Sequence, residues 1–117
     1  MPHNLRLVEG HKSLAVCELV GRIDALNSSA LKKELAAFVD QNKPRLIIQA
    51  QELEFIAACG LNVLLDFAQK ARSRKGGMKL VAPSSNVRRI LDLVRFSSLF
   101  DVLDSEQAAI AAFTGPA

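Results

Sequence analysis

The 117-residue chain contains no tryptophan and no tyrosine, and its whole aromatic content is six phenylalanines. Proteins that hold single-stranded nucleic acid usually stack the bases on exposed aromatic side chains, so the composition argues against that function. The formal net charge is only +3. The basic residues between 70 and 79 are expected at the carboxyl end of a helix, where positive side chains interact favourably with free carbonyl groups. We therefore expect no direct nucleic-acid partner.

Cysteine and histidine are also scarce. Cys17 and Cys59 are far apart, no pair has the spacing of a metal-binding or redox motif, and His3 and His11 both lie near the amino terminus. Cys17 falls inside an apolar segment and is expected to be a buried small side chain. The sequence predicts no metal site and no cofactor.

Long apolar runs are absent too. No segment approaches the roughly 18 apolar residues of a membrane span, and the first residues lack the apolar core of a signal peptide. The chain also has no carboxylate pair at catalytic spacing, no glycine-rich phosphate loop and no Ser/His/Asp set. We expect one cytoplasmic domain over residues 1–117, without a membrane span and without enzymatic activity.

What the sequence does have is a regular alternation of apolar segments. The expected strands cover residues 5–8, 14–20, 45–50, 78–82 and 99–103, the first two joined by a turn at 9–12. The expected helices begin at Asn27 or Ser28 after a loop over 22–29, at Gly60, within 83–86, and after Ser105. The first should end before Pro44, the second near Arg74 and the last at Phe113, while the third includes Val94. This order, ββαβαβαβα, predicts an α/β fold with an open mixed sheet of about five strands and four helices.

The most informative segment is the turn between the strand at 45–50 and the following helix. It carries Ala57, Ala58 and Cys59 directly before Gly60. A strand-to-helix turn of this kind offers the positive end of a helix to a partner. Here the turn has no acidic or hydroxyl group.

Four segments, in this order and spacing, resemble one known family. They are Gly21-Arg22-Ile23-Asp24, Phe55-Ile56 with Gly60-Leu61, residues 80–83 with the helix at 87–91, and residues 100–108. Together they resemble the STAS domain of bacterial anti-sigma-factor antagonists over nearly the whole chain. The resemblance implies the STAS fold.

Members of that family typically carry an Asp-Ser-Ser-Gly-Leu loop whose first serine is phosphorylated by an anti-sigma kinase. On this pattern Ala57 stands at the aspartate, Ala58 at the phosphorylated serine and Cys59 at the second serine, while Gly60 and Leu61 are kept. Alanine has no hydroxyl, so Ala58 cannot accept phosphate.

The resemblance also implies a partner: an anti-sigma factor of the GHKL serine-kinase type, whose capture releases a sigma factor. The implied partner-binding residues are Asp24, Phe55, Ile56, Ala57, Ala58, Cys59, Gly60, Leu61 and Asn62. STAS domains also serve as accessory subunits of lipid- or anion-transport complexes, docking on an ATPase or a permease, and this is the alternative function. Homodimerisation is left open.

The sequence leaves two interpretations open for Asp24 and two for Cys59. Asp24 either helps to shape the partner surface or caps a helix. Cys59 is either a redox-sensitive thiol at a helix amino end or a small residue that fills the space of a serine.

Overall fold

The computed structural model describes residues 3–8, 11–41, 43–93 and 101–114. Its strands within these residues are β1 (His3–Val8), β2 (His11–Leu19), β3 (Gly21–Ile23), β4 (Arg45–Gln49), β5 (Leu53–Ile56), β6 (Gly77–Val81) and β7 (Val102–Leu103). Its helices are α1 (Ala25–Val39), α2 (Ala58–Ser73), α3 (Ser85–Leu93) and α4 (Glu106–Thr114).

Five of the strands form one mixed sheet in the order β1-β2-β4-β6-β7. β1 and β2 are antiparallel, as expected for a hairpin, and the pairs β2–β4, β4–β6 and β6–β7 are parallel. The predicted α/β fold with a five-stranded mixed sheet and four helices is confirmed. The order ββαβαβαβα holds for the main sheet and the helices.

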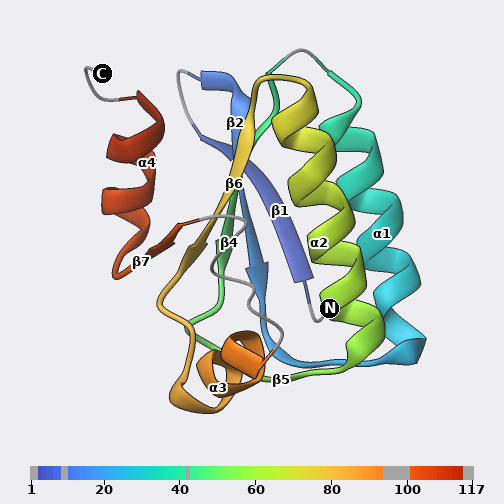
Figure 1. The fold of residues 1–117 in the computed structure, drawn as a ribbon. Coiled ribbons are helices and arrows are strands. Elements are labelled where there is room, and N and C mark those ends of the chain that lie inside the picture. Colours follow the sequence, from blue (N-terminus) through green and yellow to red (C-terminus); the bar gives the residue numbers. More distant parts are fainter. Residues whose placement is uncertain (1–2, 9–10, 42, 94–100, 115–117) are drawn as a thin grey trace.

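Helices cover both faces of this sheet (Figure 1). α1 and α2 lie side by side on one face and α4 lies on the other. The central strand β4 serves both layers, because Leu46 and Ile48 join the core on one side while Ile47 packs in a second cluster with Ala109 of α4. All three β4 side chains are fully buried. An apolar run without alternation is typical of a strand covered on both faces, and β4 is such a strand.

A second, two-stranded sheet was not predicted. β3 and β5 pair in parallel, with Ile23 opposite Ile56, and both of these side chains are buried. The prediction of a loop over residues 22–29 is therefore wrong, since Arg22 and Ile23 belong to β3 and α1 begins at Ala25. Such short strands carry too few residues for a periodic pattern, and only their long-range pairing defines them.

The predicted helix starts need two corrections. The amino-terminal cap of α1 is Asp24 rather than Asn27 or Ser28, and α2 begins at Ala58 rather than at Gly60. The predicted cap of the last helix is confirmed, because the Ala108 amide donates to Ser105 Oγ at 3.1 Å. Three predicted features lie partly outside the described residues: the turn at 9–12, the third helix at Val94, and the first part of the strand at 99–103.

Candidate functional site

The amino end of α2 lies at one end of the molecule, together with the start of α1, the β3–β5 sheet and α3 (lower part of Figure 1). Two backbone hydrogen bonds hold this helix start in place. The Ala57 amide donates to the Ile23 carbonyl at 2.8 Å, and the Leu61 amide donates to the Ala57 carbonyl at 3.0 Å. The turn thus sits directly on the small sheet.

Gly60 is the residue that permits this close contact. A Cβ atom at Gly60 would lie 2.7 Å from Ile23 Cγ2 and 2.9 Å from Ile56 Cγ1, which is closer than carbon atoms pack. Both isoleucines are buried and cannot move aside freely. The glycine of the family pattern therefore has a packing function in this chain: it brings the first turn of α2 against β3 and β5.

The predicted site residues divide into an exposed set and a supporting set. Ala58 and Asn62 are exposed, Ala57 and Cys59 are half-buried, and Ile56, Gly60 and Leu61 are buried beneath them. Phe55 is half-buried, with the Arg22 guanidinium 4.5 Å from its ring centroid. The structure thus gathers these residues at one end of the molecule, and the buried ones shape the surface from below.

The first turn of α2 has no side-chain cap. Ala57 occupies the cap position without a side-chain acceptor, and no acidic residue lies in the first turn. The free amide groups at such a helix end carry partial positive charge. Since the Ala58 side chain is a methyl group, this end of α2 is exposed and positive but has no atom that could be phosphorylated.

Asp24 is fixed by a capping box. Its Oδ1 accepts from the amides of Leu26 and Asn27 at 3.0 and 3.1 Å, and Asn27 Oδ1 accepts from the Asp24 amide at 2.8 Å. Asn27 Nδ2 also donates to the Arg22 carbonyl at 2.8 Å. The capping interpretation of Asp24 is therefore confirmed, and the cap connects β3 to α1 beside the amino end of α2.

Replacing Asp24 with alanine is expected to lower the free energy of unfolding by about 1 kcal/mol, since it removes both acceptor bonds of the cap. Asp24→Asn keeps a side-chain oxygen in the same position and is expected to recover most of this loss. Urea denaturation of the two variants beside the parent measures the difference. Equal losses in both variants would show that the two hydrogen bonds to the side-chain oxygen do not account for the contribution of Asp24 to stability.

Sequence analysis missed one feature of this end of the molecule. Leu26, in the first turn of α1, is 90% exposed. The helical spacing of the buried residues Ser28, Leu31 and Leu35 excludes Leu26 from the core face, so its exposure could have been predicted from the sequence. Leu26 thus leaves one apolar side chain exposed at the start of α1.

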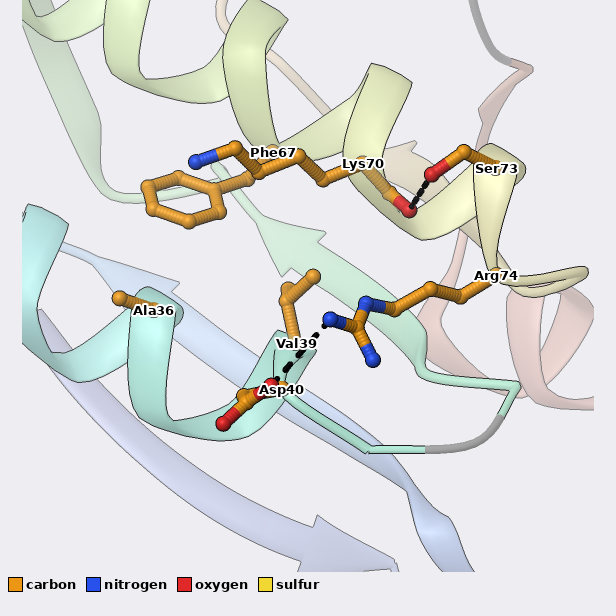
Figure 2. A pocket seen from close by; sticks show the side chains of 7 residues that line it. All are labelled: Ala36, Val39, Asp40, Phe67, Lys70, Ser73 and Arg74. Carbon is orange, nitrogen blue, oxygen red and sulfur yellow. Dashed lines mark hydrogen bonds and ion pairs between the residues drawn. The ribbon is translucent and has the colours of Figure 1, made fainter.

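A groove between α1 and α2 begins at Cys59 and continues toward the helix carboxyl ends. Its far part is lined by Val39, Asp40, Phe67 and Arg74, and the Arg74–Asp40 ion pair of 3.2 Å crosses it (Figure 2). Cys17, by contrast, is fully buried in the core, and burial raises the pKa of its thiol to about 12. The accessible thiol is therefore that of Cys59.

Within residues 3–8, 11–41, 43–93 and 101–114, no three His, Cys, Asp or Glu side chains gather closely enough to hold a metal ion. No helix among those residues has the length and apolarity to cross a bilayer.

Comparison with known proteins decides the family. The STAS domain model matches residues 6–109. The chain is a member of the STAS domain family. BtrV of Bordetella bronchiseptica, named as a candidate anti-sigma factor antagonist, is 35% identical over 95 residues, which cover 81% of this chain and 82% of that protein. The crystal structure of an anti-sigma factor antagonist from Mycobacterium paratuberculosis superposes with a TM-score of 0.79 at 27% identity, covering 95% of this STAS chain and 93% of that one.

The fold itself is shared more widely. The STAS domain of a SulP transporter from Vibrio cholerae has a TM-score of 0.67 and 20% identity to this chain, covering 87% of it and 81% of the transporter domain. Architecture therefore does not separate the two functional groups of STAS domains.

Proposed function

We propose that residues 1–117 form a single, non-enzymatic STAS domain that binds an anti-sigma factor of the GHKL serine-kinase type in the bacterial cytoplasm and so releases a sigma factor. The identity to BtrV over four fifths of the chain supports this function over the transport alternative, which only the shared fold supports. The proposed partner-binding residues are Asp24, Phe55, Ile56, Ala57, Ala58, Cys59, Gly60, Leu61 and Asn62.

The observation that carries the proposal is the exposure of Ala58 on an uncapped helix end. Ala58 and Asn62 face solvent one turn apart on α2, and Leu26 is exposed at the start of the neighbouring helix. The surface is partly apolar and has the positive end of α2 at its centre. Such a surface suits a protein partner that offers a small apolar patch with acceptor groups around it.

The absence of a hydroxyl at Ala58 determines how this surface is regulated. Phosphorylation adds about −1.5 to −2 charges and repels a partner that fits the neutral surface. Because Ala58 cannot be phosphorylated, we propose that the domain binds its partner irrespective of ATP and kinase activity.

Replacing Ala58 with glutamate is expected to lower the affinity for the anti-sigma factor at least about tenfold, because it buries an unpaired charge in the interface. Titration calorimetry with the anti-sigma factor encoded in the same genome measures the effect. Ala112→Glu is the matched control, since Ala112 is exposed on α4, on the opposite face of the sheet, and its replacement should leave affinity unchanged. Equal affinities of the two variants would place the docking surface elsewhere.

A further inference from the structure

The part of the α1–α2 groove next to Cys59 has the size of a small-molecule site. Its volume is about 350 Å³, and its lining includes Ser28, Lys32, Cys59, Asn62, Asp66 and Lys70. Pockets that hold small ligands begin at about 300 Å³. This hollow opens beside the first turn of α2, and the core residues Val63 and Phe67 also line it.

Ser28 is the unexpected residue in this lining. It is 7% exposed and is the one buried polar side chain in the described residues, on the α1 face that carries Leu31 and Leu35. Its hydroxyl has no hydrogen-bond partner among those residues, although its amide donates to the Asp24 carbonyl. Among the described residues, Arg45 Nε is the fully buried side-chain nitrogen or oxygen without a hydrogen-bond partner, so the Ser28 hydroxyl oxygen is accessible from the hollow that it lines. A ligand in the hollow could therefore form a hydrogen bond with this hydroxyl in place of water.

The charges around the hollow also have a definite pattern. Lys32 and Lys70 supply two cations and Asp66 one carboxylate, and within the described residues none of the three forms an ion pair. The Lys70 ammonium lies 4.9 Å from the Phe67 ring centroid, with its chain extended away from Arg74 (Figure 2). It therefore points along the groove, while Arg74 is paired with Asp40.

We propose that this hollow binds a low-molecular-weight thiol of the glutathione class, attached to Cys59 as a mixed disulfide. Such a molecule carries two carboxylates and one ammonium group, which match two lysines and one aspartate in number and sign. Its peptide groups offer hydrogen bonds to Ser28 and Asn62. A lone accessible cysteine would not select a ligand; the surrounding charges do.

The attachment is a thiol–disulfide exchange. The Cys59 thiolate attacks one sulfur of the oxidised disulfide form of the small thiol, a new S–S bond forms to Cys59, and the original S–S bond breaks. The departing thiolate takes up the proton that Cys59 released. The disulfide is the only oxidant required, and a dithiol reductant reverses the step.

Resting on the proposed function, this attachment regulates partner binding. Cys59 adjoins Ala58 in the first turn of α2, so the adduct places bulk and a net negative charge beside the docking surface. This change has the same sign as the one that phosphate would make at a serine in this turn, although it is smaller. A redox-controlled group thus takes the place of the missing phosphate.

The site is tested on the isolated protein with oxidised glutathione, followed by intact mass measurement and peptide mapping. One glutathionyl group is expected on Cys59 and none on Cys17. Lys32→Ala should slow the reaction with oxidised glutathione at least about threefold relative to Lys33→Ala, a neighbouring lysine on α1 outside the hollow. With the uncharged disulfide of mercaptoethanol, the two variants should react equally fast.

The proposal is overturned if Lys32→Ala and Lys33→Ala react at the same rate with oxidised glutathione, or if Cys17 is modified as readily as Cys59. The regulatory consequence has its own measurement, which compares anti-sigma-factor binding by the reduced, thiolated and re-reduced protein. Loss of binding on thiolation and recovery on reduction support it, and unchanged binding refutes it. If the reduced protein fails to bind, the proposed function fails, while the kinetic comparison still decides whether the site exists.

Discussion

Replacing Gly76 with alanine is expected to lower the free energy of unfolding by about 3 kcal/mol or more. A Cβ atom on Gly76 would overlap the backbone carbonyl of Pro44. Side chains can rotate away from a new methyl group, but this obstacle is main chain. It is also held in place, because the Gly77 amide donates to the Pro44 carbonyl at 2.9 Å and the Gly76 amide donates to the Ala71 carbonyl at 2.8 Å. The link between the end of α2 and the start of β4 must therefore open to admit the methyl group.

Gly77→Ala is the matched control for this prediction. A Cβ atom there would meet Phe113 Cε1 at 3.4 Å, which is ordinary contact with a half-buried ring that can turn. We expect a loss below about 1 kcal/mol. Guanidinium denaturation of both variants, followed by circular dichroism, gives the comparison. Similar losses would show that the contact with Pro44 yields easily and that the proposed rigidity of this junction is wrong.

The main sheet and the helices could be predicted from sequence because each carries its own pattern. The continuous apolar run at Leu46-Ile47-Ile48 is typical of a strand covered on both faces. Leu31, Leu35 and Leu64 recur at helical spacing, which is typical of core residues, and all three are buried. β3 and β5 carry no such pattern, since they consist of three and four residues and are defined by the pairing of Ile23 with Ile56. Local sequence could not reveal a partner more than thirty residues away. The same pairing explains why α1 begins at Ala25, earlier than the predicted start at Asn27 or Ser28. β3 ends at Ile23, so the next residue, Asp24, occupies the cap position.

The site was predictable to the extent that its residues are consecutive. The turn from Ala57 to Leu61 could be located in sequence, and the methyl group at Ala58 follows from residue identity, whereas its exposure is known only from the structure. The groove beside it could not be foreseen, because Ser28 and Lys32 on α1 meet Cys59 and Asp66 on α2 only once the helices pack in parallel. The exposure of Leu26 did not attract notice in the sequence because single exposed leucines are common on protein surfaces.

Restoring the family pattern with the double substitution Ala57→Asp and Ala58→Ser is expected to convert the chain from a protein that takes up no phosphate at this turn into a stoichiometric kinase substrate. The structure favours this outcome because the backbone needs no change. Ala57 already has the extended conformation of a cap residue, with φ −77° and ψ 165°, and lacks only a side-chain acceptor. Ala58 is exposed, so a serine hydroxyl there would be accessible, and the positive helix end would stabilise the phosphate.

The measurement is intact mass spectrometry after incubation with ATP and the anti-sigma kinase of the same genome. Ala57→Asp alone is the matched control, since it supplies the cap but no hydroxyl, and it should remain unmodified at this turn while gaining about 1 kcal/mol of stability from the cap. The single variant therefore distinguishes the effect of restoring the helix cap from the effect of restoring the phosphorylatable hydroxyl. Phosphate in this turn of the parent chain would refute the assignment of Ala58 to the acceptor position. A double variant that gains the stability of the cap and binds the kinase, yet takes up no phosphate, would show that recognition needs residues beyond this turn.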